Sequence, residues 1–290
     1  MRRVEGQKEN FVLPEDFPVW LRRSQVKRPT PYGPNYHAAM EIHLIRSGNG
    51  QYFIRDANYL LGTNTVIIVH KNEIHTYIPD PEPAVIKDTY LLFSPHLLRQ
   101  RPVASAALRR LAHIRHLVLS NSQVIVAEFL LNNIAEEAAN EYMNWKESIL
   151  NHIENFLIIL HRAAEGEVVN HVNPDPVMPE IIRYLEEKFT ENLSLAELSN
   201  HFGLSSYNLC RRFKKYVGSG FKEYVILRRI VEAKKLLEET DMKVTAVAYE
   251  VGFDSTSTFN RDFRLLTGVT PADYRRLAIS CKQAESLSIR

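Results

Sequence analysis

Hydrophobic and polar positions alternate in short runs between residues 30 and 95, as they do in half-buried β-strands. The run at 41–46 ends in a Ser-Gly-Asn-Gly turn, so residues 51–55 are predicted to return beside it as a hairpin. A β-branched run at 65–69 predicts a buried strand, and shorter runs follow at 77–78, 84–86 and 89–93. Many short strands at close spacing predict a small sandwich or barrel.

The apolar spacing becomes helical from about residue 96. It predicts short helices at 96–100 and 105–110 and a long helical stretch at 124–164. The second half of that stretch carries one apolar stripe, made of Ile149, Ile153, Phe156, Leu157 and Leu160. We expect this stripe to lie in the core; the alternative is a helix that pairs with a second subunit.

Residues 170–179 are polar and contain three prolines. Because proline lacks a backbone donor and disfavours helix in the residue before it, this segment is predicted to be a linker. It separates an N-terminal domain at 1–169 from a C-terminal domain at 180–290, whose periodicity is helical throughout. The predicted fold class is therefore α+β, with the strands in the first domain and an all-α second domain.

One pattern occurs twice in the C-terminal domain. Arg211 and Arg261 occupy matching places 50 positions apart, and the turn glycines Gly203 and Gly252 are 49 apart. Each copy has a short helical run, a glycine and a second helical run, which is the order of a helix-turn-helix. A repeat is stronger evidence than a single motif, and two such units indicate a protein that binds two adjacent stretches of the DNA major groove.

Local signals mark the helix ends in the first copy. Ser194 and Glu197 form a predicted capping box, and Gly203 suits the sharp turn that follows. Ser205 or Ser206 is the expected cap of the second helix.

The second helix of each copy has an exposed face that suits the major groove, where arginine bonds guanine and asparagine bonds adenine. In the first copy this helix spans about 206–216, and its predicted DNA contacts are Ser206, Tyr207, Asn208, Arg211, Lys214 and Lys215. In the second copy the cap is Asp254 or Ser255, and the predicted contacts are Thr256, Ser257, Asn260 and Arg261. A polar face on a single helix is about as often merely solvated, and the repeat favours DNA. Asp262 would repel phosphate, so we place it off the contact surface.

Residues 221–239, between the two copies, predict a single helix. Its roughly nineteen residues span roughly 28 Å, and successive major grooves on one DNA face are about 34 Å apart. A rigid connection of this length can set the two reading helices about one DNA turn apart.

Residues 178–277 resemble the DNA-binding domain of the AraC/XylS family of bacterial transcription regulators. The resemblance rests on the stretches 246–253, 259–264 and 268–276. It implies that exposed residues of both reading helices contact bases, which adds Cys210, where a polar residue is commoner in the family. It also implies a transcription regulator, by default an activator, that binds promoter DNA and recruits RNA polymerase.

Residues 30–95 are similar to the cupin-like sensor barrel common in that family. His37 and Glu41 match the spacing of the first cupin motif and His75 matches part of the second, while Asn35 stands where metal-binding cupins have their first histidine. Three ligands remain that could hold a divalent metal. The family generally uses this barrel as a pocket without metal, so we expect no metal and no cofactor, and a metal site is the alternative.

The resemblance further implies a small-molecule effector in the mouth of the barrel. Aromatic faces pack on sugar rings, so a carbohydrate is favoured; the alternative is that the aromatic residues fill the core. The expected effector-binding residues are Trp20, Tyr32, Tyr36, His37, Glu41, Tyr52, His75 and Tyr77. His43 and His70 are expected to be strand residues rather than ligands.

Composition narrows the function further. A chain of 290 residues with 45% hydrophobic and 24% charged residues is typical of a globular protein, and a net charge of +2 does not by itself indicate a nucleic-acid partner. Without a long apolar run or a signal peptide, we expect a cytoplasmic protein with no membrane partner. The two cysteines allow neither a disulfide framework nor a cysteine zinc site. No phosphate loop, nucleophile elbow or zinc-protease pattern indicates an enzyme.

The sequence thus predicts a one-component regulator. The cupin-like barrel senses the effector, the helical region joins two subunits in a homodimer, and the all-α domain, with two helix-turn-helix units on a linker helix, binds a promoter. The effector would shift the population between placements of the DNA-binding domains. The alternatives are a cupin-type metal enzyme fused to a DNA-binding domain and a regulator whose DNA binding needs no effector.

Overall fold

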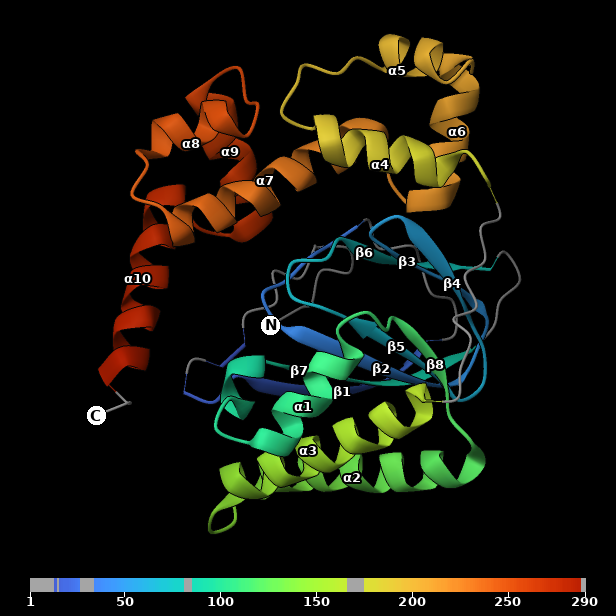
Figure 1. The fold of residues 1–290 in the computed structure, drawn as a ribbon, viewed down its shortest axis with the longest axis vertical. Helices are drawn as coiled ribbons and strands as arrows, with labels where there is room; N and C mark the ends of the chain where they lie inside the picture. The colour runs from blue at the N-terminus through green and yellow to red at the C-terminus, as the bar shows by residue number, and fades with distance from the viewer. Residues whose placement is uncertain (1–12, 15, 27–33, 81–84, 166–174, 288–290) are drawn as a thin grey trace. The chain divides into compact units, whose positions relative to one another are not determined.

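The central strand of the N-terminal part is β2 (Met40–Ser47), which has an antiparallel partner on each edge (Figure 1). The structure is a computed structural model of the chain and describes residues 13–14, 16–26, 34–80, 85–165 and 175–287. β2 belongs to a five-stranded sheet, in the order β1 (Val19–Val26), β7 (Ile86–Phe93), β2, β5 (Thr65–Val69) and β8 (His116–Val118). A second sheet has the order β4 (Ala57–Leu61), β3 (Gly50–Ile54) and β6 (His75–Pro79).

Alternate residues of β2 serve opposite faces of its sheet. Met40, Ile42 and Leu44 are buried in a core that the strands share with the helices. Glu41 and His43 point the other way, toward Tyr52 on β3 of the second sheet. Three apolar positions of the strand therefore face the helices, while the polar pair and Ile45 lie on the face turned toward the second sheet.

The predicted hairpin between the first two strands is wrong. The strands themselves are present, but β3 pairs with β4 and β6, while both edges of β2 are occupied by β5 and β7. Gly48 (φ 116°) and Gly50 (φ 148°) lead the chain out of one sheet and into the other. The predicted runs at 65–69 and 77–78 lie in β5 and β6, and the run at 89–93 lies in β7. The sequence pattern does not predict β1, β4 or β8.

Three helices and a short 3-10 turn pack beside the five-stranded sheet. The turn covers Pro95–Leu98, and the helices are α1 (Pro102–Leu111), α2 (Asn121–Asn140) and α3 (Trp145–Ala164). The helical stretch predicted at 124–164 is thus two helices. Glu141 (φ 48°) and Asn144 (φ 64°) take left-handed conformations between them, which ends one helix and lets the next fold back against it.

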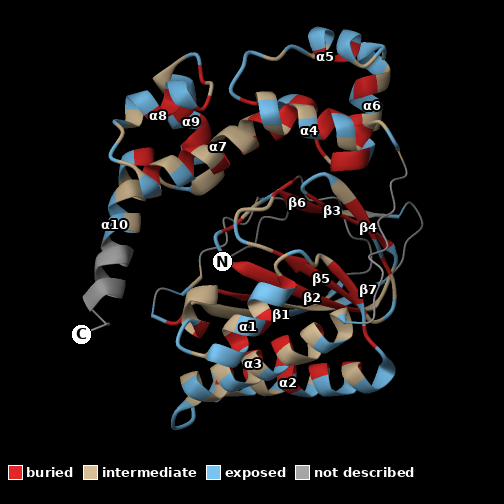
Figure 2. Ribbon diagram, in the orientation of Figure 1, coloured by how far each residue is buried: buried red, intermediate tan, exposed pale blue. Residues whose placement is uncertain are grey.

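The apolar stripe of α3 lies in the core, as predicted. Its five members are all fully buried (0% exposed): Ile149, Ile153, Phe156, Leu157 and Leu160. Figure 2 shows the buried residues gathered on the strands and on the inner side of these helices. The stripe is therefore not available to pair with a second subunit.

The C-terminal part is all helix. The first helix-turn-helix and the helix before it comprise α4 (Met178–Lys188), α5 (Leu195–His201) and α6 (Ser206–Val217). The connecting helix α7 (Phe221–Glu239) has the predicted bounds, and α8 (Val244–Glu250), α9 (Thr256–Thr267) and α10 (Pro271–Leu287) follow it. α7 contacts α6 from the first group and α8, α9 and α10 from the second.

The described chain separates into two units between Pro174 and Asp175. The first half of the predicted linker, residues 170–174, lies outside the described residues, and its last two positions already belong to α4, which begins at Met178. The strand-rich first unit and the helical second unit give the predicted α+β class. Among the helices that the structure describes, none has the length and apolar character needed to cross a membrane.

Candidate nucleic-acid interface and buried sensor cluster

Helix α6 presents one polar face to solvent and buries the other. Leu209 and Phe213 are fully buried, whereas the Tyr207 side chain is 79% exposed. Of the predicted contacts on this helix, five are exposed and one, Asn208, is half-buried; the exposed ones are Ser206, Tyr207, Arg211, Lys214 and Lys215. Cys210 is exposed as well. The hydroxyl of Ser206 lies 2.9 Å from that of Ser199 on α5, so this side chain also joins the two helices of the unit.

Helix α9 repeats this arrangement in the second helix-turn-helix. Phe259 and Phe263 are fully buried, and the predicted contacts lie on the other side of the helix. Ser257, Asn260 and Arg261 are exposed and Thr256 is half-buried. Both α6 and α9 therefore offer an outward polar face with an arginine near its middle.

Asp262 is buried, in agreement with its placement off the contact surface. Its Oδ1 accepts a hydrogen bond of 2.9 Å from Nε of Arg261, whose side chain is 72% exposed. The carboxylate raises the pKa of the Arg261 guanidinium through this hydrogen bond. The buried Asp262 carboxylate thus orients the exposed side chain of Arg261 and does not itself lie on the exposed face of α9.

The two turns are built alike and differ by one residue. The amide of Gly203 donates to the Asn200 carbonyl and that of Gly252 to the Tyr249 carbonyl, both in left-handed conformations (φ 63° and 91°). The helix caps are Ser205 and Ser255, each accepting from the backbone amide three residues on. Asp254 is therefore the extra residue that makes the glycine spacing 49 and the cap spacing 50.

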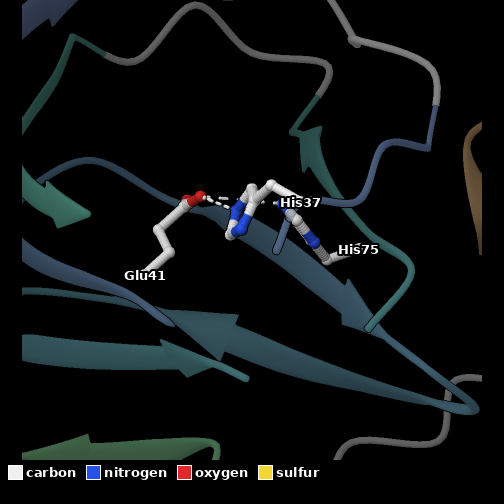
Figure 3. Close-up of side chains that lie close together, drawn as sticks. All are labelled: His37, Glu41 and His75. Atoms are coloured by element: carbon white, nitrogen blue, oxygen red, sulfur yellow. Dashed lines mark hydrogen bonds and ion pairs between the residues drawn. The ribbon is translucent and has the colours of Figure 1, made fainter. Parts of the chain in front are cut away.

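A polar cluster centred on Glu41 lies between the two sheets of the first unit (Figure 3). Oε2 of Glu41 is 2.5 Å from Nε2 of His37 and 3.8 Å from Nε2 of His75. Its other oxygen, Oε1, contacts Nε2 of His43 and accepts a 3.2 Å hydrogen bond from the Tyr52 hydroxyl. All five side chains are buried.

The protonation of this cluster follows from burial and charge together. Burial alone would raise the pKa of Glu41, but the charge of His43 and hydrogen bonds from His37 and His43 outweigh it and hold that pKa well below its usual value. Burial would likewise lower the pKa of His43, but Glu41 and Asp88 raise it to about 10. Burial dominates at His75 and lowers its pKa to about 4.

The structure brings together four of the predicted effector-binding residues, namely His37, Glu41, Tyr52 and His75. Trp20 packs edge-on against Tyr90. Tyr77 lies opposite Tyr52 on the neighbouring strand, and its hydroxyl donates to the Asn49 carbonyl. Tyr36 is half-buried, and Tyr32 lies outside the described residues.

His43 lies in β2, as predicted, and also contacts Glu41 of the cluster. It stacks on Tyr90 and its Nδ1 lies 3.3 Å from Oδ2 of Asp88, so these two residues also belong to the surroundings of Glu41. The sequence contains a signal for this contact, because side chains alternate between the two faces of a strand and residues 41 and 43 of β2 therefore share a face. His70 instead faces the Ile114 carbonyl, away from the cluster.

A cleft of about 550 Å³ has Asp88 in its lining. Its lining is polar and charged, and includes Arg23, Gln25, Arg46, Lys87, Asp88 and Glu128. None of the predicted effector-binding residues lines it. Asp88 is thus shared between this cleft and the buried cluster.

A pair of helix-turn-helix units on one connecting helix, attached to a strand-rich unit, defines a two-part regulator architecture. The AraC-like ligand binding domain matches residues 27–122, and a helix-turn-helix domain model matches residues 198–277. The transcriptional activator AarP of Providencia stuartii is 36% identical over 99 residues, covering 34% of this chain and 73% of AarP. The chain belongs to the AraC family of DNA-binding transcription regulators.

Two further proteins are similar over longer stretches. The regulatory protein PocR of Salmonella typhimurium is 31% identical over 160 residues, which cover 53% of this chain but only about half (49%) of PocR. An apo structure of ToxT from Vibrio cholerae is 16% identical, covering 89% of this chain and 96% of that one, with a TM-score of 0.39.

Proposed function

We propose that the protein is a sequence-specific regulator of transcription that reads two adjacent segments of promoter DNA. The observation that carries the proposal is the matched pair of exposed faces on α6 and α9, each behind a glycine turn and a serine cap. A solvated helix would need no such repetition. The predicted contact residues on these faces are proposed to touch DNA, with Arg211 and Arg261 reading bases.

The length of the connecting helix supports a fixed distance between the two reading helices, α6 and α9. α7 has 19 residues, which corresponds to roughly 28 Å of helix. Its inward residues, such as Ile230 and Ala233, are fully buried, so the rod is fixed to its neighbours. We therefore propose two half-sites about one DNA turn apart, or about 10 base pairs.

Selection from random duplex DNA with the full-length chain, at physiological salt, tests this proposal. We expect an enriched motif with two half-sites about 10 base pairs apart. A motif with one half-site would contradict base reading by the second helix-turn-helix. Binding that enriches nothing and disappears as salt rises would overturn sequence-specific recognition altogether, because it would reflect phosphate attraction alone.

Activation is the proposed direction of regulation. AarP, a relative that is 36% identical over 99 residues, is named as a transcriptional activator. We propose that this chain likewise recruits RNA polymerase to its promoter. Transcription in vitro from a promoter carrying the selected motif should rise when the protein is added, and a fall would identify a repressor. The relatives are regulators, and we propose no enzymatic activity.

The proposed effector is a small polar molecule, with a carbohydrate favoured, bound in the cleft beside Asp88. The cleft volume of about 550 Å³ suits a small ligand, and its charged and amide side chains can hydrogen-bond several hydroxyl groups. Binding there would act on the contact of 3.3 Å between Asp88 and His43. Calorimetry with a panel of sugars should give heat that Arg46→Ala removes and the exposed control Arg110→Ala retains. No heat with any sugar would contradict the carbohydrate.

We further propose that the protein is a homodimer joined through α2. The stripe of α3 is buried, but α2 exposes three apolar side chains on neighbouring turns: Ile125 (68%), Val126 (47%) and Phe129 (62%). A second copy of this helix, packed antiparallel, would cover the patch with the same residues, which is how two-fold interfaces are built.

A further inference from the structure

Three possible donor atoms lie close together in the N-terminal unit. They are Nε2 of His37, Nε2 of His75 and a carboxylate oxygen of Glu41, and all three side chains are buried (Figure 3). Donor atoms of the three residues lie within 4.8 Å of one another. His37 precedes β2 and His75 opens β6, and a backbone bridge between Asn35 and His75 fixes these two segments side by side.

The backbone determines which nitrogen of each histidine faces Glu41. Nδ1 of His37 is 3.1 Å from the Ala39 carbonyl, and Nδ1 of His75 is 2.8 Å from the Glu73 carbonyl. A carbonyl oxygen only accepts, so Nδ1 carries the hydrogen in both rings and Nε2 of a neutral ring is a lone pair. This is the usual anchoring of metal-binding histidines, in which a carbonyl or carboxylate holds the other ring nitrogen.

In neutral rings both Nε2 lone pairs would face an oxygen that cannot donate. Oε2 of Glu41 is 2.5 Å from Nε2 of His37, which demands a positive charge between the two atoms. The 3.8 Å separation from Nε2 of His75 is too long for a hydrogen bond, so a proton shared with His37 leaves Nε2 of His75 without a hydrogen bond to this oxygen. Donors about 2.1 Å from one tetrahedral ion lie about 3.4 Å apart, a value between these two distances.

The rest of the cluster leaves this oxygen free for an ion. His43 and the Tyr52 hydroxyl both occupy the other carboxylate oxygen, Oε1 of Glu41. They orient the carboxylate so that Oε2 points at the two histidines. Such outer contacts are what fixes a ligating carboxylate in metal sites.

We propose that His37, Glu41 and His75 bind one divalent transition-metal ion between the two sheets of the first unit. Two imidazole nitrogens and one carboxylate oxygen suit zinc, nickel, cobalt, iron or manganese better than calcium or magnesium. Three protein ligands leave at least one coordination position for water or an oxygen atom of another ligand. The family resemblance implies a pocket without metal. The donor geometry favours the alternative, a metal site. The proposal concerns the N-terminal unit alone and does not depend on which DNA the C-terminal unit binds.

The test uses the full-length chain without a histidine tag, stripped with a chelator and dialysed. Calorimetric titration with zinc chloride should give one site per chain, and elemental analysis after dialysis should find one ion per chain. His75→Ala and Glu41→Gln should each weaken zinc binding more than tenfold. The matched control is His113→Ala, which removes an exposed histidine of the same unit and should leave the affinity unchanged.

Cobalt(II) gives a second readout that needs no variant. The wild-type chain with one equivalent of cobalt should show the visible absorption of a low-coordinate nitrogen and oxygen site, and zinc should abolish it. Less than a tenth of an ion per chain for zinc and cobalt alike would overturn the proposal. So would equal affinity in wild type and in a folded His75→Ala variant, since the cluster would then be only a hydrogen-bond network. Binding to the selected DNA, measured separately, distinguishes this failure from failure of the regulator proposal.

Discussion

Asp175 and Arg212 form a two-pronged ion pair between the start of the C-terminal unit and its first reading helix. Nε of Arg212 donates a 2.7 Å hydrogen bond to Oδ2 of Asp175, and Nη2 contacts Oδ1. The neighbouring Arg211 is exposed. Of two consecutive arginines on α6, one therefore anchors the chain where it enters the unit and the other is free to meet DNA.

Breaking this pair should destabilise the C-terminal unit modestly. Both side chains are partly exposed, so Asp175→Ala or Arg212→Ala should lower the free energy of unfolding by about 0.5–1.5 kcal/mol. Urea denaturation followed by circular dichroism measures this loss. Lys235→Ala, which removes a looser surface pair with Glu232 at 3.9 Å, is the control and should change little. Equal effects in all three variants would contradict an anchoring role.

The same pair predicts a pH dependence. The hydrogen bond from Arg212 lowers the pKa of Asp175 below its ordinary value of 3.8. A lowered folded-state pKa means that the stabilisation is complete above the ordinary value and is lost as the pH falls through the folded one. The stability difference between wild type and Asp175→Asn should therefore be constant from pH 7 to about 5 and shrink below about pH 4. A difference that grows on acidification would contradict the assignment.

Arg211→Ala and Arg261→Ala should each weaken binding to the selected DNA by about 1–3 kcal/mol if these arginines read bases. Fluorescence anisotropy with specific and random duplexes measures the loss on each. The control, Lys222→Ala, removes an exposed cation on α7 outside the reading helices. An equal loss on both duplexes would assign the arginine to phosphate contact instead.

The two turn glycines should differ in their tolerance of alanine. Both are left-handed, so each substitution costs about 1–2 kcal/mol of backbone strain. A Cβ at Gly203 would meet nothing within 4 Å, but at Gly252 it would lie 2.3 Å from the Thr190 carbonyl oxygen. Gly252→Ala should therefore lower the free energy of unfolding by about 1–3 kcal/mol more than Gly203→Ala. Thermal denaturation of both variants is the comparison, and equal losses would show that the second turn can move away from Thr190.

The α2 interface predicts a change of oligomeric state. Phe129→Glu introduces a charge into the exposed apolar patch and should convert the dimer to a monomer in light scattering at micromolar concentration. Val103→Glu alters an equally apolar exposed position (54%) on α1 and should leave the mass unchanged. A wild-type protein that is already monomeric would refute the homodimer.

The C-terminal unit was predictable because its signals are local. The Ser194–Glu197 capping box, the cap at Ser205 and the bounds of α7 all lie where the sequence places them. Each depends on residues within one or two helical turns, so a linear pattern contains the necessary information. The helix bounded by Glu141 was less predictable, since a left-handed glutamate gives no sequence signal.

The N-terminal unit was less predictable because strand pairing is not local. The chain turns after β2 as expected, but which strand lies beside β2 depends on β5 and β7, more than fifteen residues away. The same limit applies to the buried cluster. The spacing of the cupin-like motifs identified His37, Glu41 and His75, and the alternation of β2 could have added His43. The role of Asp88 follows only from the pairing of β2 with β7 in the folded sheet.

The length of α7 has a rotational consequence as well as a translational one. One residue added to its middle would lengthen the helix by about 1.5 Å, less than half of a base-pair step, but would turn everything beyond it by about 100°. DNA needs about three base pairs to turn as far. The number of residues in α7 therefore sets the orientation of the second reading helix relative to the first, as well as the distance between them. A single insertion should silence the second reading helix on its own operator. An insertion of seven residues, close to two full turns, should restore the orientation of that helix but move it by about 10 Å, or about three base pairs, where the groove has itself turned by about 100°, so binding to the operator should not return.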